Sequence, residues 1–237
     1  FILRAHGPIE LARAALRFVR GRSAPSILDE CELVYQALDA SRTRGTMVDV
    51  GAHFGTSLLP FATSGWRVLA LEPDARNRAR LETTVLGIAN VTIDTRAASD
   101  HTEADVQFFR SGVSTGISGL SAFDPSHFEA DRVQLTTLDE ILSDHGITAI
   151  DFLKIDTEGF DLMVLKGLPW QRIRPKVIVC EFEDAKSIPL GYTHDALACF
   201  LSDHGYSVLI SEWRPIVKYG VAHSWARMVE YPSALLE

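Results

Sequence analysis

The sequence has little cysteine, with three residues, Cys31, Cys180 and Cys199, in a chain of 237. An odd number leaves at least one thiol unpaired, so a complete disulfide framework is excluded. Each cysteine stands among apolar neighbours in the sequence, a context typical of reduced, buried thiols. We therefore expect a cytoplasmic protein.

The chain also lacks long apolar runs and an excess of positive charge. No apolar run approaches the ~20 residues of a membrane span, and no signal peptide is visible, so we expect no membrane span. The formal net charge of -8, with no compensating basic tract, argues against nucleic acid as a partner. Arg13, Arg17, Arg20 and Arg22 form a local basic face, which we interpret as the solvated face of a helix rather than a membrane-binding surface.

The remaining composition, with 46% hydrophobic and 23% charged residues, is that of a globular domain with a well-buried core. Strand and helix patterns alternate from residue 46 onward, which predicts a doubly wound α/β domain over residues 46–237. Residues 1–45 are expected to form an extension with two helices, at 8–20 and 27–40. The chain begins at Phe1 rather than at methionine, so we keep open a fusion to other domains in a longer protein.

Residues 46–55 organise the domain. A short apolar strand at 47–50 ends in a turn with the pattern Asp49-x-Gly51-x-x-x-Gly55. A dinucleotide-binding turn would read Gly-x-Gly-x-x-Gly, with room for a pyrophosphate. Here the third glycine is missing and an acid that would repel phosphate precedes the turn. The acid suits a ligand with a cationic amino-acid group and no phosphate, such as S-adenosylmethionine.

A second informative acid, Glu72, follows the expected strand at 67–71. An acid at this place, about 20 residues past the glycine turn, can accept hydrogen bonds from both ribose hydroxyls of a nucleoside. Asp74 is already placed to cap the helix expected at 75–86, so we favour ribose binding for Glu72. Farther along, Ala98 and Ser99 are small residues past which an adenine ring could slide.

Several acids follow the later strands. The strand at 150–155 leads into Asp156 and Glu158, and the strand at 176–180 leads into Glu181 and Glu183. Open α/β sheets bind ligands at the carboxyl ends of their strands. These four acids could alternatively collect a divalent cation. We disfavour a metal site, because strand alternation should separate Glu181 from the other acids. The loop at 111–131 is interpreted as either a substrate lid or a disordered insertion.

Six segments in this order resemble the FkbM family of S-adenosylmethionine-dependent methyltransferases: residues 48–55 (VDVGAHFG), 71–74 (LEPD), 137–141 (TLDEI), 150–159 (IDFLKIDTEG), 164–167 (VLKG) and 174–181 (RPKVIVCE). The resemblance implies a Rossmann-like class I methyltransferase fold, with a mostly parallel seven-stranded sheet and a reversed last strand. It also implies O-methylation as the reaction class. The chain departs from the family at His53, where asparagine is common, and at Asp161, the last place of a Glu-Gly-x-Glu pattern.

With this resemblance, we assign site residues by the part of the reaction they would serve. We expect Asp49, Gly51 and His53 around the methionine end of the cofactor, Glu72 on the ribose, Ala98 and Ser99 beside the adenine, and Asp156 facing the methyl group. Ala52, Gly55 and Pro73 are further expected cofactor-binding residues. Glu158 and Glu181 are expected to line the pocket of a small-molecule acceptor with a hydroxyl group. Asp156, Glu158, Glu181 and His53 are the candidate catalytic groups, and we assign no metal ligand.

Two other functions remain open at this point. A nicotinamide-dependent oxidoreductase would share the fold and the ribose-binding acid. A non-catalytic module that binds the cofactor within a larger protein would share the whole cofactor site.

Overall fold

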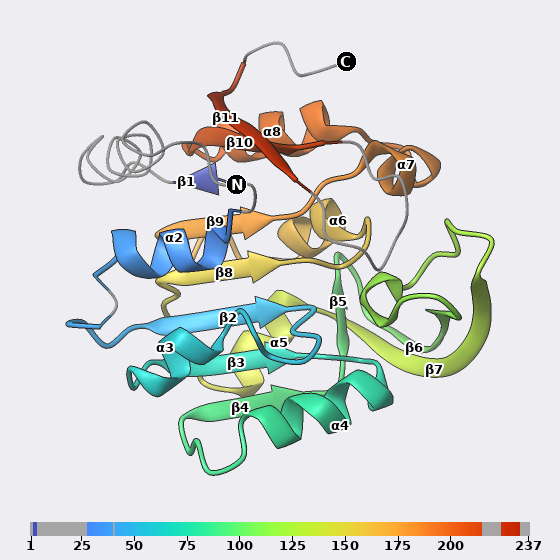
Figure 1. Ribbon diagram of the computed structural model, residues 1–237, viewed down its shortest axis with the longest axis horizontal. Coiled ribbons are helices and arrows are strands. Elements are labelled where there is room, and N and C mark those ends of the chain that lie inside the picture. The colour runs from blue at the N-terminus through green and yellow to red at the C-terminus, as the bar shows by residue number, and fades with distance from the viewer. Residues whose placement is uncertain (1, 4–27, 40, 215–223, 233–237) are drawn as a thin grey trace.

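The computed structural model describes residues 2–3, 28–39, 41–214 and 224–232. In this part of the chain, one large sheet carries helices on both faces, and a small sheet stands beside the carboxyl ends of its central strands (Figure 1). The large sheet contains, in spatial order, β11 (Trp225–Glu230), β10 (Ser207–Trp213), β1 (Ile2–Leu3), β9 (Val177–Cys180), β8 (Phe152–Ile155), β2 (Thr46–Val50), β3 (Arg67–Leu71) and β4 (Val91–Asp94).

The sheet is mostly parallel, as the sequence predicts. Strands β4, β3, β2, β8 and β9 are parallel neighbours. The reversed last strand is also present, because β11 runs antiparallel to β10. The expected count of seven strands is wrong, since the described residues form eight. The additional strand, β1, lies antiparallel between β9 and β10, and its two residues are too few to give a sequence pattern.

Helices connect most of the parallel strands of the large sheet. They are α2 (Glu30–Ala37), α3 (Leu59–Thr63), α4 (Ala75–Thr84), α5 (Leu138–Asp144), α6 (Asp161–Lys166), α7 (Asp184–Ser187) and α8 (His194–Asp203), with short 3₁₀ turns η1 (Thr115–Ile117) and η2 (Ile188–Leu190). Of the two helices expected in the extension, the one at 27–40 corresponds to α2, and the one at 8–20 lies outside the described residues.

Alternation along the central strands divides the core into two layers. In β2, Val48 and Val50 pack with residues of α5, α6 and α8, whereas Met47 packs with residues of α2, α3 and α4. All four residues from Met47 to Val50 are buried, which is typical of a parallel strand covered on both faces. Helix α2 of the extension therefore covers the same sheet as the helices of the α/β domain.

A small three-stranded sheet contains β5 (Ala97–Ser99), β7 (His127–Thr137) and β6 (Glu103–Ser111), in that order. Strands β6 and β7 flank the loop that the sequence predicts at 111–131, and β7 begins within that range. They form an antiparallel hairpin that projects past the carboxyl ends of β2, β3 and β8 (Figure 1). The hairpin thus stands where α/β sheets bind their ligands.

The cysteines only partly match their expected burial. Cys31 and Cys180 are buried, whereas Cys199 is exposed on α8, and all three are free thiols.

None of the described helices combines the length and apolar character that a membrane crossing requires.

Gly167 joins the two sheets by close packing. It ends α6, but its φ of -77° lies outside the left-handed region, so backbone freedom does not explain the residue. A Cβ at this position would lie 2.0 Å from the backbone oxygen of Ser99 in β5. Only a residue without a side chain therefore lets α6 approach β5.

We expect Gly167→Ala to lower the free energy of unfolding by about 1–3 kcal/mol, because the added methyl group overpacks this contact. Gly112→Ala is the matched control, since its Cβ would meet nothing closer than an oxygen at 3.8 Å. Urea denaturation measures both variants. Equal unfolding midpoints for the two would contradict the packing role of Gly167.

Candidate active site

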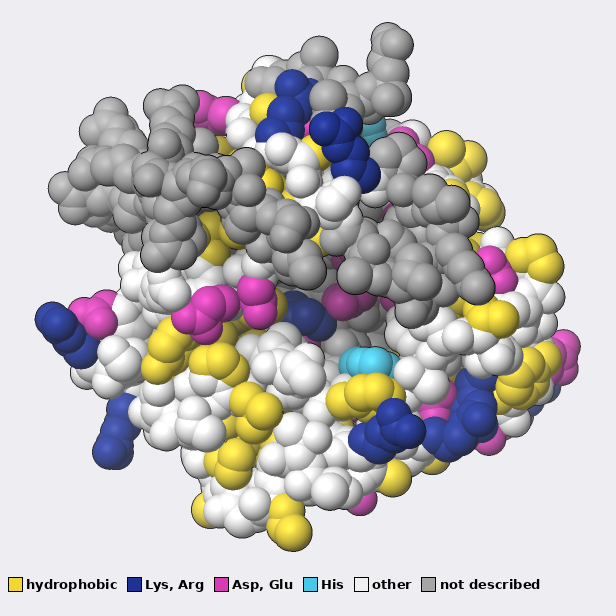
Figure 2. All heavy atoms as spheres, viewed as in Figure 1, with side chains coloured by type: hydrophobic (Ala, Val, Ile, Leu, Met, Phe, Trp, Pro, Cys, Tyr) yellow, Lys and Arg dark blue, Asp and Glu magenta, His cyan; other side chains and the backbone are white. Residues whose placement is uncertain are grey.

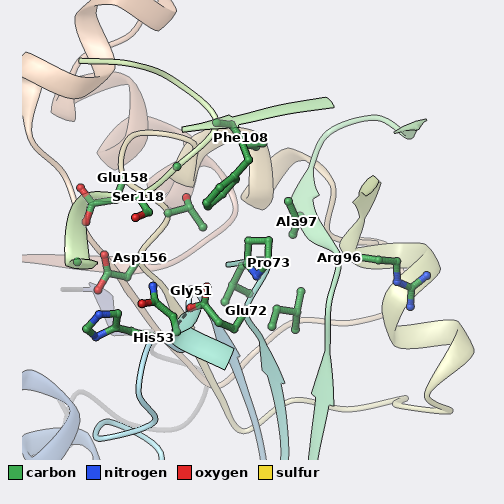
Figure 3. Close-up of a pocket in the computed structure, with 18 of the residues that line it drawn as sticks. Gly51, His53, Glu72, Pro73, Arg96, Ala97, Phe108, Ser118, Asp156 and Glu158 are labelled. Atoms are coloured by element: carbon green, nitrogen blue, oxygen red, sulfur yellow. Dashed lines mark hydrogen bonds between the residues drawn. The ribbon is translucent and has the colours of Figure 1, made fainter. Parts of the chain in front are cut away.

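A pocket of about 130 Å³ lies between the carboxyl ends of β2, β3 and β8 and the loop of the β6–β7 hairpin (Figure 3). Its apolar wall includes Leu71, Pro73, Ala97, Ala98, Phe108 and Leu120, and its acids are Glu72, Asp156 and Glu158. In the space-filling view, this face of the molecule has a hollow with acidic side chains inside and a histidine at its rim (Figure 2). The pocket is thus apolar on one side and acidic on the other.

The glycine turn after β2 forms the floor of the pocket. Gly51 has a φ of 78°, and a Cβ there would lie 1.9 Å from the backbone oxygen of Asp156. Position 51 therefore excludes every side chain, both by conformation and by space. His53 follows with a φ of 50°, and its backbone N–H points to Glu72.

Glu72 is held rigidly at the end of β3. Its Oε2 accepts a hydrogen bond from the backbone N–H of His53 at 2.7 Å, and its Oε1 accepts one from the backbone N–H of Asp74 at 2.9 Å. Glu72 is only 4% exposed, and this burial raises its pKa to about 7 against the opposing effect of the two N–H donors. Each carboxylate oxygen keeps a lone pair for a ligand hydroxyl.

Asp49 serves the sheet rather than the pocket. It lies opposite Lys154 in the β2–β8 register, and its Oδ1 is 3.2 Å from the Lys154 ammonium. Its Oδ2 accepts a hydrogen bond from the Ser57 hydroxyl at 2.7 Å. The same ammonium donates to the backbone oxygen of Gly51 at 3.2 Å and lies 3.4 Å from Asp156. Asp49 thus acts on the pocket through Lys154, which fixes the turn and Asp156.

The acidic end of the pocket brings together residues that the sequence analysis separated. Carboxylate oxygens of Asp156, Glu158 and Glu181 lie within 4.8 Å of one another, so the expectation that alternation sets Glu181 apart is wrong. Alternation fails because Glu158 has a φ of 58°, which turns the chain out of the strand direction. A buried cation, Lys186, contacts Glu158 at 2.6 Å and Glu181 at 3.1 Å.

The hairpin loop is fastened to the glycine turn and to α4, so the interpretation as a disordered insertion is wrong. The His53 ring lies 3.1 Å from the Thr115 hydroxyl, and Asn77 donates to the backbone oxygen of Thr115 at 3.2 Å. Next to the loop, near the end of β6, Arg110 binds both carboxylate oxygens of Asp74 at 2.8 and 3.0 Å. These contacts hold the loop as one wall of the pocket.

The pocket contains most of the predicted site residues. Those that line it are Gly51, His53, Glu72, Pro73, Ala98, Asp156 and Glu158. Those that do not line it are Asp49, Ala52, Gly55, Ser99 and Glu181. Ser99 is fully buried, and its place at the wall is taken by Ala97. Gly55, with a φ of 83°, faces Leu81 of α4 instead of the pocket.

Sequence reasoning missed several residues of the site. Phe108, Thr115, Leu120 and Asn77 line the pocket from the hairpin and α4. The loop at 111–131 was interpreted as a possible substrate lid, but this signal named no residue. Lys186 gave no sequence signal, because a lysine in a four-residue helix resembles a surface residue.

Comparison with known proteins gives one curated relative and several solved structures. AMB antimetabolite synthetase AmbE of Pseudomonas aeruginosa is 28% identical over a 234-residue match that covers 78% of this chain and 11% of the relative. The chain therefore corresponds to about a tenth of that protein's length.

The solved structures are more distant in sequence. Methyltransferase FkbM from Methylobacillus flagellatus KT is 19% identical, with a TM-score of 0.44, and the match covers 85% of this chain and 56% of the other. A putative O-methyltransferase from Klebsiella pneumoniae is 13% identical, with a TM-score of 0.48 and coverages of 94% and 89%. These likenesses are too distant to carry a substrate or a site residue over to this chain.

The sequence profile of the methyltransferase FkbM domain matches residues 49–208. This range begins at the glycine turn and includes Glu72, the hairpin, the acidic end of the pocket and strand β9. By this match over more than half of its length, the chain belongs to the family of methyltransferase FkbM domains.

Proposed function

We propose that the chain is an S-adenosylmethionine-dependent methyltransferase that methylates a hydroxyl group of a small polar acceptor, such as a sugar or a polyketide. The observation that carries this proposal is the setting of Glu72. Its buried carboxylate, aligned by two backbone N–H groups, opens into a pocket with apolar walls. Such a carboxylate suits a nucleoside with free ribose hydroxyls.

The charges of the pocket favour a nucleoside without phosphate. Among the described residues that line it, Arg96 is the one permanent cation, and it is committed to Asp94 at 2.7 Å and Asp144 at 2.7 Å. The acids Glu72, Asp156 and Glu158 would repel a pyrophosphate. This arrangement disfavours the nicotinamide-dependent oxidoreductase and agrees with a ligand that carries a sulfonium.

The proposed cofactor would lie across the whole pocket. Glu72 would hold the ribose, Ala97 and Phe108 would flank the adenine, and Asp156 would lie at the methionine end. Bound S-adenosylmethionine would supply a methyl group that is already activated for displacement. The chain's own residues would align the acceptor hydroxyl and take its proton, and Glu158 is the pocket carboxylate placed for this role.

We further propose that this domain works as one part of a larger, cytoplasmic protein. The match to a tenth of the length of an antimetabolite synthetase supports this idea. A small acceptor could then be a building block that other parts of such a protein supply.

Calorimetry with S-adenosylhomocysteine and with NADH tests the cofactor, and a radiolabelled methyl donor with a panel of hydroxylated acceptors tests the reaction. We expect binding of S-adenosylhomocysteine and a methylated product. Binding of NADH in its place would favour the oxidoreductase. Binding of S-adenosylhomocysteine without any methylated product would favour the non-catalytic module.

Replacement of Glu72 should weaken the cofactor site selectively. We expect Glu72→Ala to reduce the affinity for S-adenosylhomocysteine at least about ten-fold, which corresponds to ~1.4 kcal/mol, because the ribose hydroxyls lose their acceptor. Glu82→Ala, at an exposed position on α4, is the control and should bind like the wild type. Unchanged affinity in a folded Glu72→Ala variant would remove Glu72 from the site.

The raised pKa of Glu72, about 7, predicts a pH dependence of cofactor binding. The ionised carboxylate accepts hydroxyl hydrogen bonds, and its protonation removes that capacity. Affinity for S-adenosylhomocysteine should therefore rise from about pH 6 to about pH 8, by up to ten-fold per pH unit below the pKa. Isothermal titration at several pH values measures this effect, and Glu72→Gln should flatten the profile. A wild-type profile that runs the opposite way would contradict the prediction.

A further inference from the structure

Lys186 has a position that the proposed function leaves unexplained. The side chain is 2% exposed, yet its ammonium lies 2.6 Å from Glu158, 3.1 Å from Glu181 and 3.0 Å from Glu183. Burial of an ammonium is costly unless it is paired, and the three carboxylates supply that pairing. Glu158 lines the pocket, so the lysine contacts the pocket wall from behind.

Lys186 packs against the backbone next to Glu158. Glu158 adopts a φ of 58°, which costs a non-glycine residue about 1–3 kcal/mol and persists only where the surroundings hold it. The next residue, Gly159, packs so closely that a Cβ there would lie 3.1 Å from the Cβ of Lys186. On the pocket side, a Cβ at Gly119 of the hairpin loop would lie 3.3 Å from the Cβ of Glu158. Glu158 is thus fixed between the loop and Lys186.

We propose that Lys186 is a positioning residue that holds Glu158 and Glu181 together as one shared proton acceptor for the hydroxyl of the methyl acceptor. This inference rests on the proposed function and adds to it a residue that touches neither cofactor nor acceptor. It also gives Glu181, which does not line the pocket, a part in the reaction through its partner Glu158.

The charges that face Glu158 explain why a cation is needed. Asp156 at the end of β8 and Glu181 at the end of β9 contribute negative charge at Glu158, and Lys186 contributes positive charge. Asp161 of α6 adds negative charge at Glu181, and Glu183 beside α7 contacts Lys186. Lys154 is a second cation nearby, and it is shared between Asp49 and Asp156. Loss of Lys186 would therefore remove a buried cation that contacts both Glu158 and Glu181.

The neighbouring acids and Lys186 together set the proton affinity of Glu158 and Glu181. Burial and the neighbouring acids raise the pKa values of Glu158 and Glu181, whereas Lys186 lowers both. A carboxylate with an ordinary pKa is a weak base toward an alcohol, so the raised values favour proton transfer. The lysine counters the rise by favouring the ionised forms of both groups, which are the forms that accept a proton.

The proposed methyl transfer needs no reactant other than the acceptor, the methyl donor and Glu158. The acceptor oxygen forms a bond to the methyl carbon while the sulfur–methyl bond breaks and its electron pair stays on sulfur. The hydroxyl proton moves to Glu158 of the shared pair. The products are a methyl ether, a neutral thioether and a protonated carboxyl group, which returns its proton to solvent after release.

Lys186→Met keeps the length of the side chain and removes its charge. We expect the titration of Glu158 and Glu181, followed by NMR of ¹³C-labelled glutamate carboxyls and assigned with Glu158→Gln and Glu181→Gln, to move upward by at least about one pH unit. Lys176→Met is the matched control, because Lys176 is an exposed lysine paired to Asp151. Titrations of the pair that are identical in wild type and Lys186→Met would overturn the proposal.

Two further readouts separate positioning from simple packing. In the methyl-transfer assay, Lys186→Met should lower kcat at least about ten-fold and move the acid limb of the pH profile to higher pH. The KM for S-adenosylmethionine should stay within about two-fold, because Glu72 is untouched. An unchanged pH profile would overturn the proposal even if kcat fell.

If Lys186→Met does not fold, a milder substitution, Glu181→Gln, tests the same pair of carboxyl groups. Glu181→Gln removes one like charge and should lower the pKa of Glu158, and an unchanged value would overturn the shared acceptor. Failure of the wild type to bind S-adenosylhomocysteine would overturn the proposed function, and with it this role. Normal binding with unshifted carboxyl titrations would overturn the role of Lys186 alone.

Discussion

The site depends on the contact between the carboxyl ends of β2 and β8. Gly51 leaves no room for a side chain against the backbone of Asp156, and the Lys154 ammonium joins Asp49, Gly51 and Asp156 beside that contact. A buried ion pair of this kind contributes little net stability, but loss of one partner leaves an uncompensated charge in the core. The pair therefore acts mainly by fixing where each strand ends. The floor and the acidic end of the pocket follow from that placement.

The remaining walls are attached to this frame by hydrogen bonds. The turn offers the N–H of His53 to Glu72, and the His53 ring contacts Thr115 of the hairpin loop. Arg110 fastens the hairpin to Asp74, the residue that caps α4. One short segment thus sets the orientation of the Glu72 carboxylate and the position of the loop opposite it. Preorganisation of this kind lowers the cost of ordering the site when a ligand binds.

Much of this arrangement could be predicted from local sequence. Two features depend only on neighbours along the chain: the glycine spacing at 51 and 55, and the acid after the strand at 67–71. The strands that precede them, β2 and β3, end where they were expected. The cap of α4 by Asp74 was predictable for the same reason. The fold class followed from the alternation of strands and helices, although a two-residue strand cannot be recognised by pattern.

The acidic end of the pocket could not be predicted, because it depends on contacts between distant segments. Alternation separates Glu158 from Glu181 only while the chain remains extended, and the positive φ of Glu158 breaks that rule. Lys186 contacts both acids from α7, which follows β9 in the chain. No local pattern distinguishes this lysine from one that faces solvent.

The central claim is that Glu72 and the acidic end of the pocket hold opposite ends of one phosphate-free nucleoside. A crystal structure of the chain with S-adenosylhomocysteine tests this claim most directly. The account predicts both ribose hydroxyls within hydrogen-bond distance of Glu72, with the sulfur facing Asp156 and Glu158. A ligand bound outside this pocket, or a ribose turned away from Glu72, would contradict it.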